Sequence, residues 1–304
     1  DRIVELFRPV PSGVLVDATL GGAGHARLLL EARPDLQLLG IDQDAEALAA
    51  AAEVLAPFGD RVTLRHARFD RLGAIMSDLE LDSAAGVLFD LGVSSPQLDV
   101  AERGFSYRKA GPLDMRMDRG QTWAAADVVN GYRENELARV LREYGDERFA
   151  GRIARVVVAA RPVHSTVELS ELVRSAIPAA ARRRGGHPAK RTFQAIRIEV
   201  NDELRVLPDA LGAALDALAP DGRLAVLSYH SGEDRIVKQT MRDAETGGCT
   251  CPPGLPCVCG AVPAVRPVGR RGRTPSAEEL EVNPRAQSAR LRVVQKLDAS
   301  GVGP

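Results

Sequence analysis

The segment Val14-Leu-Val-Asp-Ala-Thr-Leu-Gly-Gly-Ala-Gly-His25 contains three structural signals in immediate succession. Its apolar start predicts a short strand that ends at Asp17, and the glycines after it predict a tight turn into a helix. A strand, a glycine turn and a helix N-terminus in this order form a cradle for nucleotide cofactors. Glycine suits the turn because a ligand can approach its backbone without meeting a Cβ atom.

A second predicted strand, Leu36-Gln-Leu-Leu-Gly-Ile-Asp42, follows at the spacing of a βαβ unit and also ends in an acid. A carboxylate at this place can bind two ribose hydroxyls. Each feature alone is also common in ordinary structure, since a glycine turn can be only a turn and a strand-end aspartate can cap a helix. The two together predict a cofactor that carries a ribose.

The glycine pattern disfavours a dinucleotide cofactor and with it an NAD-dependent oxidoreductase. The fingerprint G-x-G-x-x-G needs a third glycine, and counted from Gly22 that position is Arg27. Asp17 also places negative charge where the phosphates of a dinucleotide would lie. A cationic ligand without phosphate, such as S-adenosylmethionine, fits this segment better.

The amino-acid composition is typical of a soluble globular protein, and basic residues are concentrated in two short segments. The chain has 304 residues, 45% hydrophobic and 27% charged, with a net charge of -1. Basic residues without acids occur at 174–197 and 266–273, which predicts contacts with an RNA phosphate backbone; a solvated surface is the alternative. No apolar run is long enough for a membrane span, and no signal peptide opens the chain, so we expect a cytoplasmic protein. Nothing in the pattern sets an oligomeric state.

Further strands, alternating with helices, are predicted at 61–66, 85–90 and 222–228, and an edge strand at 288–296. This alternation predicts a parallel sheet whose strands end at one ligand-binding edge. The residues expected near that edge are Gly13, Asp17, Asp42, Phe69 and Asp90. For Phe69, stacking on an adenine and packing in the core both fit the sequence.

A helical period without strands runs from about 123 to 180. It predicts a helical domain at 112–192, inserted into an α/β domain formed by 1–111 and 193–304. A basic tether at 182–191 leads back to one long helix predicted at 192–219.

Two segments follow strands of the predicted sheet at its carboxyl edge. Asp90-Leu-Gly-Val-Ser-Ser-Pro-Gln-Leu-Asp99 is a long polar loop of the kind that is typically functional. Ser228-Tyr-His-Ser-Gly-Glu-Asp-Arg235 follows the fifth predicted strand. We expect the two segments to form one pocket.

All four cysteines, at 249, 251, 257 and 259, lie close together in the sequence. In a reducing compartment such a group is more often a metal site than a disulfide. Paired C-x-C ligands are less usual than C-x-x-C. We therefore assign no metal ligand and keep Zn²⁺ at this cluster as the alternative to an unliganded surface loop.

These motifs resemble one family closely, the ribosomal small-subunit RNA methyltransferase H family, formerly called MraW. The matching stretches are spread over nearly the whole length of the chain and are 17–21, 23–25, 41–42, 90–99, 102–106, 111–118, 187–194, 230–231 and 233–238. The family's usual stretch before Asp1 is absent here, the four cysteines are not part of its general pattern, and Gly232 stands where a larger residue is common.

The resemblance implies a class I methyltransferase with a Rossmann-like sheet. It implies transfer from S-adenosylmethionine to the N4 amino group of one cytidine, position 1402, in 16S rRNA of the small ribosomal subunit. The inserted domain would then bind RNA. By the same resemblance the cofactor contacts are Ala23, Gly24, His25, Asp42, Phe69, Asp90 and Gln97.

The chemistry of an exocyclic amine adds catalytic candidates. The cytosine amine is a poor nucleophile because its lone pair is delocalised into the ring; acceptors on its N–H groups localise that pair, and proximity to the methyl donor supplies most of the rest. We predict a catalytic role for Asp90, Ser94, Ser95, Pro96, Tyr229 and His230. Tyr229 is expected to stack on a flipped base, or else to be a packed strand-end tyrosine, and His230 to be a dispensable proton acceptor.

Two other activities use the same fold. A small-molecule methyltransferase is disfavoured by the two basic runs and the helical insertion, which a small substrate does not need. A non-catalytic RNA-binding assembly factor is disfavoured because Asp42, Asp90 and the loop 94–97 are intact.

Overall fold

The computed structural model describes residues 2–182, 186–252, 258–270 and 272–298. The chain forms two compact units, one made of Asp1–Gly92 with Leu204–Pro304 and the other of Val93–Glu203. The second unit is wider than the insertion expected at 112–192. Residues on both sides of that range, among them Phe105 and Phe193, are buried in the core of this unit.

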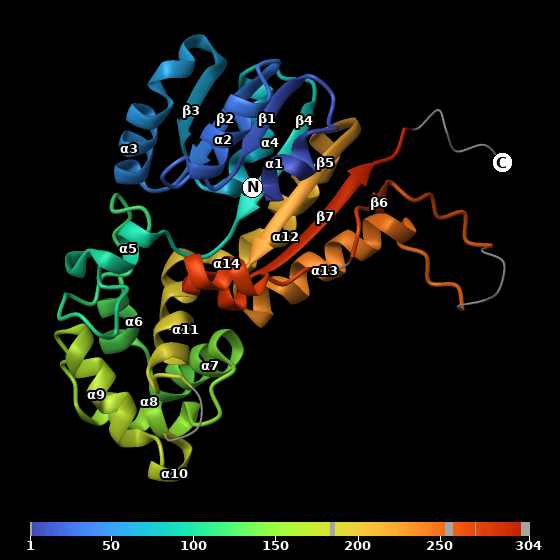
Figure 1. Cartoon of the computed structure of the whole chain (residues 1–304). Coiled ribbons are helices and arrows are strands. Elements are labelled where there is room, and N and C mark those ends of the chain that lie inside the picture. The colour runs from blue at the N-terminus through green and yellow to red at the C-terminus, as the bar shows by residue number, and fades with distance from the viewer. Residues whose placement is uncertain (1, 183–185, 253–257, 271, 299–304) are drawn as a thin grey trace. The chain divides into compact units, whose positions relative to one another are not determined.

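Within the described residues, the first unit contains a seven-stranded sheet with the order β3-β2-β1-β4-β5-β7-β6 (Figure 1). The strands are β1 (Gly13–Asp17), β2 (Leu36–Asp42), β3 (Val62–His66), β4 (Ala84–Asp90), β5 (Leu218–Ser228), β6 (Val265–Pro267) and β7 (Arg290–Lys296). β1 to β5 are parallel, and β7 runs antiparallel to both β5 and β6. The Rossmann-like sheet expected for a class I methyltransferase is confirmed.

Helices cover both faces of this sheet. They are α1 (Arg2–Phe7), α2 (Gly24–Ala32), α3 (Ala45–Leu55), α4 (Leu72–Asp78), α12 (Glu203–Ala217) and α13 (Ser231–Thr246). A further helix, α14 (Ala277–Val282), precedes β7 and has no buried residue. Neighbouring strand residues belong to different cores: Leu15 packs with α1, α2 and α3, whereas Val16 packs with α4, α12 and α13. Successive side chains of a strand point to opposite faces, so a strand buried on both faces is apolar throughout.

Gly86 in β4 allows a close contact on one face of the sheet. A Cβ atom at this position would lie 2.5 Å from a ring carbon of Phe7. The absence of a side chain therefore lets the aromatic ring of α1 lie directly on the strand.

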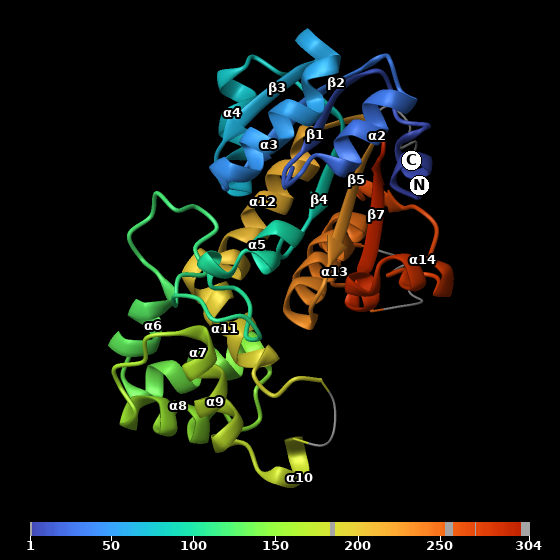
Figure 2. The ribbon, with the colours of Figure 1, turned by 60° about the vertical axis from the view of Figure 1, so that its left-hand side comes forward.

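The second unit is helical and has its own apolar core. Its helices are α5 (Ser95–Asp99), α6 (Ala125–Gly131), α7 (Glu134–Gly145), α8 (Ala150–Ala159), α9 (Thr166–Ala176), α10 (Ala179–Arg182) and α11 (Lys190–Asn201). α7 packs against both α8 and α11, and α8 packs against α9 (Figure 2). Short 3₁₀ turns elsewhere in the chain span Ala56–Arg61, Phe69–Arg71, Ala101–Arg103 and Pro284–Ser288.

Two expectations about single elements are wrong. The long helix expected at 192–219 is two helices, because Asp202 adopts a left-handed conformation with φ 57° and ends α11 just before the chain enters the first unit. β7, expected as an edge strand, lies between β5 and β6. The alternation of β7 reflects its two partly covered faces rather than a free edge. No helix among the described residues is both long enough and apolar enough to cross a bilayer.

Candidate active site

Three aspartates mark the carboxyl edge of the sheet. Asp17, Asp42 and Asp90 are the last residues of β1, β2 and β4. β1 lies between β2 and β4, so the three strand ends are neighbours. The chain reverses its strand order between β1 and β4, and ligands of open α/β sheets bind at such a switch point.

The three carboxyl groups share an environment that disfavours negative charge. Burial raises the pKa of Asp17 to about 8, with smaller contributions from the nearby charges of Asp90 and Asp42. Burial also raises the pKa of Asp42 and of Asp90. A cation bound near these groups offsets their mutual repulsion and favours their ionised forms.

Asp42 is held by backbone amides. One carboxylate oxygen accepts a hydrogen bond from the Gly21 N–H at 2.7 Å, and the other accepts one from the Asp44 N–H at 2.8 Å. Asp44 in turn caps α3 by accepting from the Glu46 N–H at 3.1 Å. The carboxylate thus connects the glycine turn to the start of α3 in a fixed orientation.

The glycine turn leaves room for a ligand. Gly21 and Ala23 both have positive φ, 51° and 60°, and α2 begins at Gly24 without a side-chain cap. Left-handed backbone costs a non-glycine residue roughly 1–2 kcal/mol, and such strain is typical of functional sites. A Cβ atom added to Gly22 or Gly24 would meet no atom within 4 Å, so the backbone of the turn faces open space.

Asp90 is held by side chains from distant parts of the sequence. Tyr229 donates a hydrogen bond from its hydroxyl to one carboxylate oxygen at 2.7 Å, and the second oxygen lies 3.7 Å from His25 Nε2. The Asp90 backbone N–H donates to the Thr19 hydroxyl at 2.6 Å. Burial and the charge of Asp90 raise the pKa of Tyr229, so this hydroxyl remains a donor at neutral pH.

The segment that follows β5 is organised by a buried glutamate. Glu233, 2% exposed, accepts hydrogen bonds from the backbone N–H groups of Tyr229 at 2.7 Å and His230 at 3.2 Å. His230 Nδ1 accepts from the N–H groups of Gly232 and Glu233 and so caps α13. Its Nε2 lies 3.1 Å from Glu233 but without hydrogen-bond geometry. The histidine is therefore placed as a helix cap.

Phe69 lies in the core of the first unit. Its ring is 8% exposed and meets Phe89 edge-on, with ring centroids 5.8 Å apart. Of the two roles left open by the sequence, the structure places this ring in core packing, while a contact with adenine stays a prediction.

The remaining loop candidates belong to the second unit and form the N-terminus of α5. Ser94 accepts from the Gln97 N–H at 3.4 Å, and its own N–H donates to the Gln97 side chain at 3.0 Å. Ser95 and Pro96 are the first residues of this helix. The loop thus contains a capping box, and Gln97 is 5% exposed.

Several basic residues in the run 174–197 have acidic partners that the linear sequence does not reveal. Arg197 forms a two-pronged pair with Glu203 at 2.8 and 2.9 Å, and Arg174 pairs with Glu171. Arg182 ends α10 and is exposed, while Arg183 and Arg184 lie outside the described residues. At least two basic side chains of this run are therefore paired with acids, which the linear sequence did not show.

Sequence reasoning missed the roles of Thr19 and Glu233. Glu233 stands three residues after His230 at the start of α13, which is the spacing of a capping box and a usable signal. Thr19 carries no comparable signal, because its partner Asp90 is separated from it by 71 positions.

Comparisons with known proteins find relatives over most of the length of this chain. The family model described as the MraW methylase family matches residues 1–297. The chain is 55% identical to the ribosomal RNA small subunit methyltransferase H of Symbiobacterium thermophilum, over 95% of this chain and 92% of the relative. It is 53% identical to the protein of the same name from Thermobifida fusca, over 97% of this chain and 91% of the relative. A solved putative rRNA-methylase from Clostridium thermocellum aligns over 97% of this chain and 96% of its own, with 13% identity and a TM-score of 0.45.

Proposed function

The chain belongs to the MraW methylase family, and from this premise we propose that it methylates the N4 amino group of a cytidine in 16S rRNA of the small ribosomal subunit. The observation that carries the proposal is the convergence of Asp17, Asp42 and Asp90 beside an open glycine turn. A buried acidic edge suits a cationic cofactor and is unfavourable for a phosphate-bearing one. These features fit S-adenosylmethionine, which supplies an electrophilic methyl group on a sulfonium.

In this proposal Asp42 binds the ribose of the cofactor. The amides of Gly21 and Asp44 fix its carboxylate, so little orientation has to be gained on binding. The backbone is open at Gly22 and Gly24, and we assign Ala23, Gly24 and His25 at the start of α2 as a second contact surface. Cofactor contacts of Phe69 and Gln97 stay predictions that rest on the family resemblance.

Asp90 is the acceptor for the target amine. A carboxylate that accepts from the amine N–H localises the nitrogen lone pair, and positioning near the methyl donor supplies much of the remaining acceleration. Tyr229 and His25 flank this carboxylate and limit its orientations. A contact of Ser94, Ser95 and Pro96 with the base stays a prediction that rests on the family resemblance.

Proton removal requires no strong base in this scheme. The methylated amine becomes acidic and can release its proton to water. His230 uses Nδ1 to cap α13, which supports a structural role and only a modest rate loss for His230→Ala. Tyr229 either stacks on the flipped base or orients Asp90, and its hydroxyl contact supports the second role.

The RNA substrate accounts for the helical unit and the basic runs better than a small molecule does. We expect residues in the second unit, including the tether 182–191, to contact phosphates. Neutralising Arg182, Arg183 and Arg184 should flatten the salt dependence of RNA binding in proportion to the number of phosphates that these side chains neutralise, with cofactor affinity unchanged. Arg197→Gln is a poor control because it leaves the buried Glu203 without its arginine partner. Arg8→Gln, an exposed arginine of the first unit, is the better one. An unchanged salt slope would reassign the run to solvated surface.

Mass spectrometry of 16S rRNA tests the activity directly. A strain that lacks the gene should lose one methyl group on a cytidine, and the parental gene should restore it while Asp90→Asn should not. Rescue by the Asp90 variant would remove Asp90 from catalysis, whereas a purified parental protein that fails to methylate small subunits would support an assembly role without catalysis. Methylation of free cytidine but not of small subunits would support a small-molecule enzyme. A substrate in the small subunit places the activity in the cytoplasm.

A further inference from the structure

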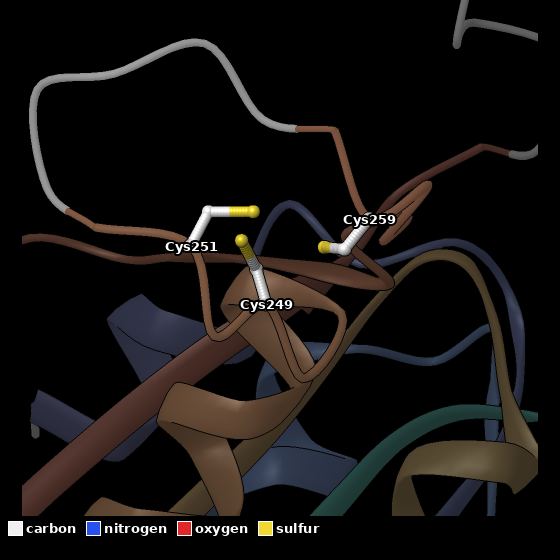
Figure 3. Close-up of side chains that lie close together, drawn as sticks. All are labelled: Cys249, Cys251 and Cys259. Carbon is white, nitrogen blue, oxygen red and sulfur yellow. The ribbon is translucent and has the colours of Figure 1, made fainter.

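A group of cysteines lies at the far end of α13 from His230. Cys249 and Cys251 follow the end of this helix, and Cys259 lies on the segment that returns to β6. Their sulfur atoms all lie within 4.8 Å of one another, and Figure 3 shows the three thiols pointing toward a common point. α13 has 16 residues, which at about 1.5 Å per residue separates this cluster from the helix start by roughly 24 Å.

Turns and backbone hydrogen bonds fix the chain on both sides of the cluster. Gly247 ends α13 in a left-handed conformation, and a Cβ atom there would lie 2.4 Å from the Val262 carbonyl oxygen. The Cys249 N–H donates to the Thr246 carbonyl at 3.2 Å, and the Ala264 N–H donates to the Ala244 carbonyl at 2.9 Å. The outgoing and returning segments are therefore both attached to the end of the helix.

The described parts of this segment have little apolar packing of their own. Val258 is 89% exposed and Val262 is 60% exposed. The described residues of this connection, 247–252 and 258–264, form no helix or strand. Long connections of this kind are uncommon in a compact domain unless they are functional or cross-linked, and a bound metal is one means of holding them. The converging thiols provide suitable ligands at this place.

We propose that Cys249, Cys251 and Cys259 bind one Zn²⁺ ion that holds the segment between α13 and β6. Thiolates at about 2.3 Å from zinc in tetrahedral geometry are about 3.8 Å apart, so small side-chain rotations bring the sulfurs from within 4.8 Å to ligand distance. Soft thiolate ligands select zinc over magnesium or calcium. Binding releases the thiol protons and leaves three thiolates on the ion. The proposal does not assign the fourth position, since Cys257 lies outside the described residues.

Zinc content of the full chain tests this site. The protein is produced with zinc, dialysed against zinc-free buffer, and analysed by elemental mass spectrometry. We expect about one zinc per chain in the parental protein and at least a tenfold loss in Cys249→Ser, Cys251→Ser and Cys259→Ser. Val258→Ser is the matched control, because it makes a similar change in the same segment without removing a thiol, and it should retain its zinc.

Two further measurements test whether each variant is folded and whether the metal site has tetrahedral thiolate geometry. S-adenosylmethionine affinity should be unchanged in all four variants, because the cluster lies far from the carboxyl edge; this shows that each variant is folded. Cobalt added to the metal-free parental chain should give the visible absorption of a tetrahedral thiolate site. A parental chain without zinc would overturn the proposal. So would a triple Cys→Ser variant that retains zinc, or a non-reduced mass that reveals disulfides among these cysteines.

Discussion

Asp42 and Asp90 end strands of the same sheet, yet they are fixed in different ways. Asp42 accepts from backbone amides of Gly21 and Asp44, which lie 21 and 2 positions away in the chain. Asp90 accepts from the side chain of Tyr229, 139 positions away. Local chain geometry is enough for the first arrangement, whereas the second exists only when β4 and β5 are paired. Backbone amides thus hold the carboxylate that we propose binds the cofactor, whereas a side chain holds the carboxylate that we propose acts on the amine.

The largest expected effect is on methyl transfer and comes from substituting Asp90, the carboxylate that is held by a side chain. Asp90→Asn keeps the shape of the side chain and removes its charge, and we expect methyl transfer to fall about 100- to 1,000-fold, roughly 2.7–4 kcal/mol, as when a group that stabilises developing charge is removed. Single-turnover assays on small subunits measure this step. Cofactor affinity, measured by calorimetry, should change much less. A parental transfer rate would remove Asp90 from catalysis.

Asp42→Ala should act on binding instead. Loss of a charge-assisted grip on ribose should weaken S-adenosylmethionine affinity by about 1.5–3 kcal/mol. Asp44→Ala is the matched control, because it removes the cap of α3 but leaves the Asp44 N–H that holds Asp42. Calorimetry on both variants separates cofactor binding from helix capping. Equal affinity of the folded Asp42 variant and the parental protein would exclude a ribose contact.

Two substitutions of Tyr229 distinguish a role in stacking on the base from a role in positioning Asp90. Tyr229→Ala should slow methyl transfer by about 1–3 kcal/mol if the ring stacks on the base, and Tyr229→Phe should lose about 0.5–1.5 kcal/mol if the hydroxyl is what matters. The hydrogen bond from Tyr229 lowers the pKa of Asp90, opposing the effect of burial. Its loss should therefore raise that pKa and move the acid limb of the pH–rate profile to higher pH.

Each outcome for Tyr229 has a definite meaning. A parental rate and an unmoved acid limb in Tyr229→Phe would return the residue to a stacking role. Parental rates in both variants would place the stacking partner elsewhere, with Phe105 or Tyr107 as the next candidates. Cofactor affinity should stay unchanged in both variants.

The last expected effect concerns Asp17 and is measured on the stability of the protein rather than on its activity. Its folded pKa is about 8 and its ordinary value is 3.8, so the folded chain binds the extra proton between these limits. Stability of the ligand-free protein should therefore fall as pH rises from about 4 to 8 and then level off. Asp17→Asn should remove this slope, and denaturant titrations at several pH values measure it. An identical slope in the variant would show that another group is responsible.

Ionisation of Asp17 should also change the relative affinity of the site for a cationic and a neutral ligand. Above pH 8 the ionised Asp17 should favour cationic S-adenosylmethionine over its neutral product S-adenosylhomocysteine by about 1 kcal/mol more than at pH 6.5. Calorimetry with both ligands, in the parental protein and in Asp17→Asn, measures this difference. A pH-independent ratio in the parental protein would place the sulfonium away from this carboxylate.

The sequence alone determined the parts of the molecule that depend on short-range patterns. Apolar runs ending in Asp17, Asp42 and Asp90 predicted three strands of the sheet and its ligand edge, because buried parallel strands are apolar throughout and end together. The glycine turn and the cofactor cradle followed from the same spacing. The clustering of the cysteines in the sequence also indicated a metal site as one alternative.

Only the tertiary structure decided which side chains meet across the chain. It paired Tyr229 with Asp90, Thr19 with the Asp90 amide and Arg197 with Glu203, and it divided the helix expected at 192–219 at Asp202. It also set the bounds of the helical unit, because residues before 112 and after 192 bury their apolar side chains in its core. Local patterns report which residues are apolar or polar and at what period. The partner of a polar side chain is fixed by strand pairing and packing between distant segments, and no local pattern encodes it.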